Sequence, residues 1–318
     1  MTVVAHLGRL PLALLLSSSL AIAADKPFVA RDLIGDGAFT HNAEGPATGP
    51  DGALYAVNLG KDGTIARIAL QADGSARAEV FVTLPEGSTG NGIRFRDGTM
   101  YVADYTGHKI LQVNMQTRAV STFAALPEAD GPNDLALAPD GSFYASDPNW
   151  KDNSGRLWHI GRNGGVRLLE AGMTTPNGLD VSPDGKQLYV NESMSRKVWV
   201  YDRGSDGGLR NKRLLISFPD CSDGGLRNKR LLISFPDFGM DGMRCDADGN
   251  LYIARYDAGK IAVVSPQGKL LHTVALKGRK ASNVAFGGAD GKQVFVTLQD
   301  RGAVETFRSD RRGRETGH

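Results

Sequence analysis

Residues 177–190 read NGLDVSPDGKQLYV, and the same layout occurs at 133–145 as NDLALAPDGSFYA and at 241–254 as DGMRCDADGNLYIA. Each segment begins with a polar residue, continues with short apolar stretches, turns at Asp-Gly and ends in a β-rich run. Asp-Gly favours hairpin turns, because glycine tolerates the positive φ that these turns require. The pattern therefore predicts two antiparallel strands joined by a tight turn.

The pattern occurs six times along the 318 residues. The copies begin at Glu44, Asn91, Asn133, Asn177, Asp241 and Asn283. The spacings between these first residues are 47, 42, 44, 64 and 42. A period in the forties with several short strands per unit is typical of β-propellers, in which each repeat is one blade. We therefore predict an all-β fold, a six-bladed β-propeller with four-stranded antiparallel blades.

The spacing of 64 residues has a visible cause. Residues 205–220 recur letter for letter at 222–237, so the segment 205–238 contains a tandem duplication of a 17-residue unit. Removing one copy returns the spacing to 47. Because the two copies are identical, either could form the outer strand of the fourth blade, and the sequence leaves that choice open.

The propeller is predicted to occupy residues 25–307, between two segments of different character. Residues 1–24 have a lightly basic start, an apolar run and a small-residue Ala-Ile-Ala site, which predicts a secretory signal peptide and an exported, periplasmic or secreted product. The strand-like segment Phe28–Ile34 is expected to close the ring as the outer strand of the sixth blade. Residues 308–318 are predicted to be a basic disordered tail.

Charge, hydropathy and the absence of one motif argue against several partners and mechanisms. Lys and Arg number 37 against 35 Asp and Glu, and the net charge of +2 argues against nucleic acid as a partner. After the predicted signal peptide no apolar stretch approaches the length of a membrane span, so we expect no membrane contact in the mature form. The sequence also contains no G-x-S-x-G motif, which gives a serine triad no basis. The oligomeric state is not predicted.

The first position of every repeat carries a carboxylate or a carboxamide. Since the innermost strands of a propeller face its channel, these six side chains are expected to converge. Oxygen donors without a basic residue among them suit one hard divalent cation, calcium or a related ion. We take calcium as the first candidate and zinc, manganese and magnesium as the alternatives. The other explanation is that Asn and Asp before Gly satisfy local turn hydrogen bonds.

Several of these motifs resemble the senescence marker protein 30/gluconolactonase/luciferin-regenerating enzyme family. The resemblance runs from about Glu44 to Phe307 and rests on these segments in this order: Glu44-Gly45-Pro46, Pro132-Asn133-Asp134, Pro176-Asn177-Gly178-Leu179 and Asp241-Gly242-Met243. It implies a six-bladed propeller that acts as a metal-dependent hydrolase, most often a lactonase. It also implies that Glu44, Asn177 and Asp241 hold the metal and that Asn133 contacts the substrate.

Further residues follow from the same resemblance. Asn91 and Asn283, at equivalent ring positions, are expected to join Asn133 in binding substrate. The candidates for the general base are Asp241 and Asp147, which occupies the place of a further acidic residue in some lactonases of the family; the alternative for Asp147 is to cap its strand. Gly131 stands where sugar lactonases can carry Arg, so a donor for sugar hydroxyls is missing there.

Together these features predict an exported metal-dependent hydrolase, a lactonase that opens a small-molecule lactone or ester in the propeller channel. Two alternatives stay open. One is a non-catalytic propeller that binds protein or glycan through its rim loops, because a fold does not determine a function. The other is a metal-dependent hydrolase of phosphotriesters, which would use the same cation with a different leaving group.

Overall fold

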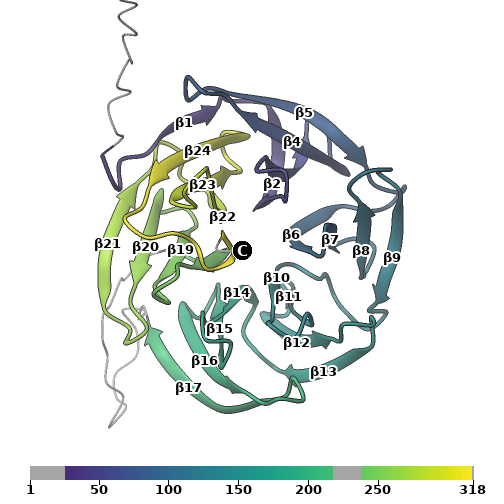
Figure 1. The fold of residues 1–318 in the computed structure, drawn as a ribbon. Coiled ribbons are helices and arrows are strands. Elements are labelled where there is room, and N and C mark those ends of the chain that lie inside the picture. Colours follow the sequence, from purple (N-terminus) through teal and green to yellow (C-terminus); the bar gives the residue numbers. More distant parts are fainter. Residues whose placement is uncertain (1–25, 218–237, 317–318) are drawn as a thin grey trace, which may run out of the picture.

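The computed structural model describes residues 26–217 and 238–316. Within these ranges 24 strands form six four-stranded antiparallel sheets, which stand as blades around a central channel (Figure 1). The predicted six-bladed β-propeller is confirmed. The predicted signal peptide 1–24 and the second copy of the duplication, 222–237, lie outside the described residues.

The blades follow one another along the chain, and within each blade the chain runs from the innermost strand outward. The first consists of β2 (Phe39–Thr48), β3 (Leu54–Leu59), β4 (Thr64–Leu70) and β5 (Ala76–Thr83). The second consists of β6 (Gly90–Arg96), β7 (Thr99–Asp104), β8 (Lys109–Asn114) and β9 (Val120–Ala125). The third consists of β10 (Leu135–Leu137), β11 (Phe143–Asn149), β12 (Ser154–Ile160) and β13 (Val166–Ala171).

The remaining blades repeat this order, with one exception at the end of the ring. The fourth consists of β14 (Pro176–Val181), β15 (Gln187–Glu192), β16 (Lys197–Arg203) and β17 (Leu209–Ser217). The fifth consists of β18 (Met243–Cys245), β19 (Leu251–Arg255), β20 (Lys260–Val264) and β21 (Leu270–Ala275). The sixth consists of β22 (Ala281–Gly287), β23 (Gln293–Leu298), β24 (Ala303–Arg308) and the N-terminal strand β1 (Arg31–Ile34).

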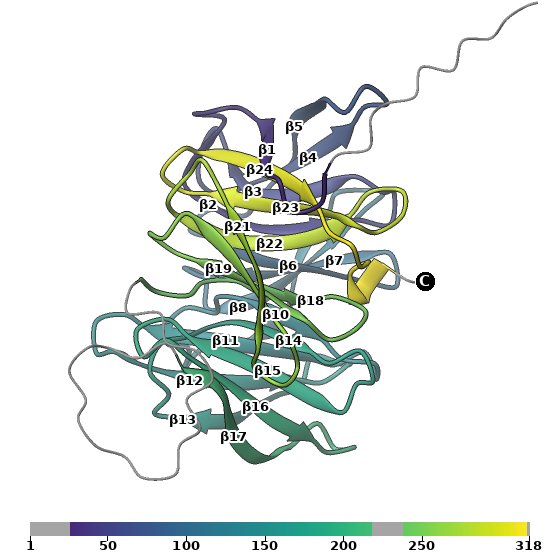
Figure 2. The same cartoon turned by 90° about the vertical axis from the view of Figure 1, so that its left-hand side faces the viewer.

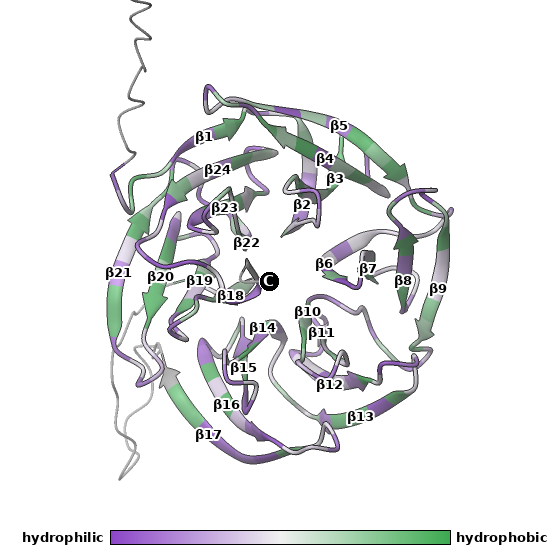
Figure 3. Cartoon of the chain, viewed as in Figure 1, coloured by the Kyte–Doolittle hydropathy of each residue, from purple (hydrophilic) through white to green (hydrophobic). Residues whose placement is uncertain are grey.

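The hydrophobic core is divided among the interfaces between blades. Buried apolar side chains form six clusters, one between each pair of neighbouring blades. Between the first two blades, Tyr55 and Val57 of β3 pack with Ile93 and Val102 of the second blade. Successive side chains of a strand point to opposite faces, so each sheet buries apolar residues on both faces, and apolar segments run along the strands in Figure 3. A blade therefore depends on both of its neighbours.

The Asp-Gly turns form as the sequence predicts. In all six copies the glycine has a φ between +71° and +83°. The preceding aspartate organises the turn, as Asp140 does by accepting the backbone N–H of Ser142 at 2.9 Å. The aromatic side chain three or four residues after the glycine, such as Tyr144, is then buried in the core.

The N-terminal strand closes the ring, as predicted. β1 pairs antiparallel with β24, with Arg31 opposite Thr306 and Asp32 opposite Glu305. Arg301 donates to Asp32 across this junction at 2.8 Å. Because β1 covers the outer edge of β24, the first and last parts of the chain share one sheet.

The first copy of the duplication forms the outer strand of the fourth blade. β17 lies within residues 205–220 and pairs antiparallel with β16 from Lys197–Ser217 to Arg203–Leu209. The sequence left the choice between the copies open, and the structure assigns this strand to the first. In the described part of the chain no helix has the length and apolar character needed to span a membrane.

The prediction of a disordered tail at 308–318 is wrong for residues 308–316. Gly313 donates its N–H to the carbonyl of Gly291 at 3.0 Å, and η1 (Arg314–Thr316) follows. Arg314 is mostly buried and donates to Asp180 at 2.7 Å. The basic side chain is ordered because it pairs with a buried carboxylate in the channel. Figure 1 shows the C-terminal end over the centre of the ring, and Figure 2 places η1 at one face of the disc.

Candidate active site

A pocket of about 730 Å³ opens at one mouth of the central channel. Its floor is formed where the innermost strands begin, and its rim is formed by loops that join the second and third strands of the blades. Five of the six ring positions line it, namely Glu44, Asn91, Asn133, Asn177 and Asp241. The C-terminal segment lies at the opposite ends of the innermost strands, beside the Asp-Gly turns.

The glycines that follow the ring residues allow neighbouring blades to approach each other. A Cβ at Gly242 would lie 2.0 Å from Oδ1 of Asn283 in the next blade. A Cβ at Gly178 would lie 2.5 Å from the carbonyl oxygen of Asp241. Both distances are far below a van der Waals contact, so only glycine fits. The recurring polar residue followed by Gly therefore reflects the crowded channel wall.

Three carboxamide oxygens of the ring have no hydrogen-bond partner within residues 26–217 and 238–316. Oδ1 of Asn91, Asn133 and Asn177 is buried in each case and accepts no hydrogen bond from this part of the chain. An unpaired buried polar atom costs about 1–3 kcal/mol. Turn hydrogen bonding therefore does not explain these three residues. Unpaired oxygens beside carboxylates are the donor set that a hard divalent cation requires, so the residues present fit such an ion.

The two carboxylates of the ring, Glu44 and Asp241, are buried near each other and near the carboxylate of Asp134. Oε2 of Glu44 accepts the N–H of Gly45 at 2.9 Å and Nδ2 of Asn283 at 3.1 Å. Burial, with the nearby Asp134 carboxylate, raises the pKa of Glu44 to about 7. Burial and the charge of Glu44 raise the pKa of Asp241 well above its usual range. Both carboxylates would be stabilised in their ionised form by a divalent cation between them.

Asn283 has a different place from the one predicted. It is not among the residues that line the pocket, so its predicted contact with substrate gains no support from the pocket geometry. Its Nδ2 supports Glu44 from behind, and its Oδ1 accepts the N–H of Val284 at 2.8 Å. The cause is the close approach of Gly242 to Asn283, which fixes the carboxamide against the neighbouring blade.

Asp147 also lies away from the pocket wall, and its carboxylate is surrounded by hydrogen-bond donors. Its carboxylate is fully buried and accepts the N–H groups of Asp130 and Gly131 at 2.8 and 2.7 Å. It also accepts Nε1 of Trp158 at 2.9 Å. All of these partners are structural donors, so the structural alternative holds: Asp147 anchors the loop that leads into the third blade near Asn133.

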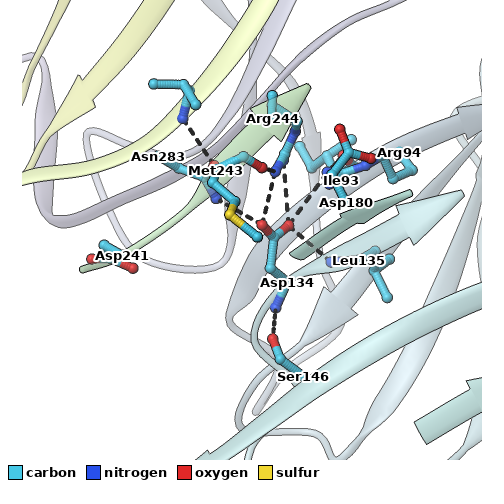
Figure 4. A network of polar contacts seen from close by, with 12 residues as sticks. Ile93, Arg94, Asp134, Leu135, Ser146, Asp180, Asp241, Met243, Arg244 and Asn283 are labelled. Atoms are coloured by element: carbon cyan, nitrogen blue, oxygen red, sulfur yellow. Dashed lines mark hydrogen bonds and ion pairs between the residues drawn. The ribbon is translucent and has the colours of Figure 1, made fainter. Parts of the chain in front are cut away.

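A buried charge network lies behind the ring, as Figure 4 shows. At its centre Asp134 accepts Nη1 of Arg244 at 2.8 Å and Nη1 of Arg94 at 3.3 Å. Nδ2 of Asn283 also lies 3.5 Å from Asp134, which connects the network to Glu44. Figure 4 shows Asp241 apart from this cluster, so Asp241 remains available to the pocket.

The rim of the pocket contains residues that the sequence did not single out. They lie in the loops after the second strand of each blade and include Asp62, Tyr105, Trp150, Met194, Asp257 and Gln299. Their position, a few residues after the second strand, repeats from blade to blade. An alignment of the repeats on that strand could therefore have identified them, although their residue types differ.

A family model described as the SMP-30/gluconolactonase/LRE-like region matches residues 42–300. The chain belongs to this family. Among its relatives, a gluconolactonase from Zymomonas mobilis is 31% identical over 218 residues, which are 63% of this chain and 58% of that protein. A regucalcin from Xenopus laevis is 30% identical over 215 residues, 64% of this chain and 67% of that protein. The matched region thus spans between about half and two thirds of the length of such relatives.

Solved structures of family members share the fold. The calcium-binding protein regucalcin from Agrobacterium tumefaciens superposes with a TM-score of 0.73 at 20% identity, covering 90% of this chain and 96% of that chain. A luciferin-regenerating enzyme gives a TM-score of 0.69 at 19% identity, covering 90% of this chain and 99% of that chain. At about 20% identity, this structural similarity shows only that the fold is shared.

Proposed function

We propose that this chain is a divalent-metal-dependent lactonase whose metal is held by Glu44, Asn177 and Asp241. The observation that carries the proposal is the ring at the pocket floor. It combines two buried carboxylates with three carboxamide oxygens that have no hydrogen-bond donor. The pocket above this ring is of a size that holds a small molecule.

When bound, a divalent cation would supply a Lewis acid that polarises the ester carbonyl and lowers the pKa of water. Calcium is the first candidate, because the donors are all oxygens. A regucalcin with the same fold is described as calcium-binding. Zinc, manganese and magnesium are the alternatives that a binding measurement compares.

The side chains of the pocket floor would orient the substrate and transfer protons. Asn91 and Asn133 line the pocket beside the proposed metal ligands and orient the lactone through their carboxamides. Hydrolysis adds water to the acyl carbon and breaks the bond between that carbon and the ring oxygen, which takes up a proton as a hydroxyl. Among the carboxylates on the pocket wall, Asp241 is our candidate to accept the proton lost by water, and a hydroxy acid is the product.

Named relatives support lactone chemistry. They include the gluconolactonase from Zymomonas mobilis, a pentonolactonase from Haloferax volcanii and a 6-deoxy-6-sulfogluconolactonase from Pseudomonas putida. Their identity to this chain is between 26% and 31%. The common element of these names is a cyclic ester of a sugar acid, so a lactone is the substrate class that we propose.

We also propose that the protein is exported after removal of residues 1–24. The support is the sequence of this segment, with its apolar run and small-residue cleavage site. Mass spectrometry of the protein recovered from the periplasm or medium tests the proposal. A recovered chain that begins near Ala24 is expected, whereas a cytoplasmic chain that keeps residues 1–24 would contradict it.

The lactonase proposal is tested on the chain from residue 25, freed of metal with a chelator. Calorimetry measures the binding of Ca²⁺, Zn²⁺, Mn²⁺ and Mg²⁺, and a pH-stat follows the opening of glucono-1,5-lactone and δ-valerolactone. The variants Glu44→Gln and Asp241→Asn are compared with Asp97→Asn, whose carboxylate is exposed on the surface in an ion pair with Arg162.

The expected result is one metal ion per chain and metal-dependent turnover, both lost in Glu44→Gln and Asp241→Asn and kept in Asp97→Asn. Binding of metal without turnover of any lactone would refute the lactonase. Hydrolysis of diethyl p-nitrophenyl phosphate in its place would favour the phosphotriesterase alternative. If no metal binds at millimolar concentration, the site assignment fails and the binding propeller becomes the better explanation.

A further inference from the structure

The wall of the pocket has two chemically different halves. The second, third and fourth blades contribute Tyr105, Trp150 and Met194. The fifth, sixth and first blades contribute Asp257, Gln299 and Asp62. Tyr256 of the fifth blade turns its hydroxyl to Gln299 at 2.9 Å and so belongs to the polar half. Because these blades follow one another around the ring in Figure 1, the apolar and aromatic rim side chains lie on one side of the pocket, beside Thr106 and Ser193, and the acidic side chains lie on the other, beside Met240.

Two residues of the apolar side are exposed. Trp150 has 43% and Met194 has 54% of its surface accessible, although both line the pocket. Large apolar side chains that stay exposed at a concave site are typical of surfaces that bind an apolar group. A ligand that covered them would gain the free energy of removing that area from water.

Tyr105 completes the apolar side, and a glycine makes room for it. A Cβ at Gly131 would lie 2.6 Å from Cε2 of Tyr105. The ring therefore occupies space that a side chain at position 131 would need. The pocket gains an aromatic surface where a longer polar side chain would otherwise enter.

The charges of the pocket are of one sign. Glu44, Asp62, Asp241 and Asp257 line it, and among the lining residues that the structure describes none is Lys, Arg or His. One divalent cation balances two of these carboxylates. An anionic group on a substrate would then face the remaining carboxylates without a cationic partner, which disfavours its binding.

We infer that the substrate is an uncharged lactone that carries an apolar alkyl or aryl group. This inference rests on the proposed lactonase function and narrows its substrate class. The lactone ring lies over the metal-binding floor, the apolar group lies against Tyr105, Trp150 and Met194, and hydroxyl or ring oxygens face Asp257 and Gln299. The polar side tolerates hydroxyls, whereas the acidic residues reject carboxylate, phosphate or sulfonate groups.

The test uses δ-valerolactone with hydrogen, methyl, butyl or hexyl at the carbon that bears the ring oxygen, and a matched δ-lactone with a carboxylate on the side chain. We expect kcat/KM to rise by about threefold for each buried methylene. The carboxylated lactone should fall below the unsubstituted one. In Trp150→Ala the rise with chain length should shrink, and Trp150→Phe should restore it.

The matched control is Leu168→Ala, which removes an apolar side chain of the same blade that is 44% exposed but lies on the outer strand β13, outside the pocket wall. It should leave the series unchanged. Alkyl δ-lactams, which resist hydrolysis, give a second measurement, since their binding by calorimetry follows chain length without requiring turnover.

The outcomes separate the two proposals. Turnover that is flat with chain length, or that favours the carboxylated lactone, overturns this inference and leaves the lactonase standing. Absence of turnover with lactam binding that still rises with chain length overturns the lactonase and leaves the apolar pocket standing. A rise that Trp150→Ala and Leu168→Ala reduce equally would also overturn the assignment of the apolar side.

Discussion

Glu44→Gln should make the metal-free protein more stable at neutral and alkaline pH. Burial raises the pKa of Glu44 to about 7 from a usual value of 4.5. The folded state therefore holds a proton that the unfolded state releases, and without metal the folded state loses stability as the pH rises from below 4.5 through 7. Glutamine keeps an oxygen that can accept from Gly45 and Asn283 and carries no charge.

The magnitude follows from the size of this shift. Each pKa unit corresponds to about 1.4 kcal/mol, so the metal-free wild type should be less stable than Glu44→Gln by about 3 kcal/mol at pH 8. At pH 5, where Glu44 is still largely protonated in the folded state, the difference should be about 1 kcal/mol. Saturating metal should reverse the order, because the ligand stabilises only the chain that binds it.

Urea unfolding in the presence of EDTA at pH 5, 6, 7 and 8 measures this difference. Asp97→Asn is the control, since it removes a carboxylate that is 67% exposed on the surface. If the wild type loses no stability relative to Glu44→Gln between pH 5 and pH 8, the account of Glu44 as a buried carboxylate that needs a cation would be refuted. A Glu44→Gln protein that is less stable at pH 8 would contradict it as well.

Three further predictions concern the ring and its ends. Arg314→Ala removes the ion-pair partner of the buried Asp180 carboxylate, leaving the charges of Arg94 and Arg244 and the N–H of Cys245, and should lower the free energy of unfolding by about 3 kcal/mol, measured with urea; a change below about 0.5 kcal/mol would contradict the ordered C-terminal segment. Deleting residues 205–221 should leave circular dichroism and turnover unchanged, because the remaining copy supplies the same outer strand; an unfolded product would show that the surplus copy is needed. Deleting residues 25–36 removes β1 and should abolish soluble expression, and a soluble product with the wild-type melting temperature would rule out ring closure by this strand.

Much of the fold follows from local chemistry. The Asp-Gly turns and the alternation of apolar residues are properties of short segments, and each turn forms from its own residues, as at Asp140 and Gly141. The repetition of these segments at a period in the forties then indicates the blades. The strand-like segment before the first repeat lies outside the six repeats. Because a closed ring needs a strand that joins its first and last blades, the place of this segment on the sixth blade could be predicted. The ring position was also predictable, because a repeat places equivalent residues around one axis.

The exact role of each polar residue depended on contacts between blades. Asn283 looks equivalent to Asn91 in the repeat, yet Gly242 of the neighbouring blade holds it behind Glu44. Asp147 was predicted as a candidate base, yet its Oδ1 accepts two N–H groups of the adjacent loop and its Oδ2 accepts Nε1 of Trp158. The sequence of one repeat does not indicate which hydrogen-bond donors of a neighbouring blade or loop will contact its polar residues.

The sequence by itself determined the six blades, the closing strand and a ring of oxygen donors, because turn propensity and periodicity act over a few residues. Only the tertiary structure decided that the basic C-terminal segment is ordered, since Arg314 finds its carboxylate partner 134 residues away in sequence. It alone also placed Tyr105, Trp150 and Met194 on one side of the pocket and acidic residues on the other. Charge pairing and close packing act through space, so these features appear only when the ring is closed.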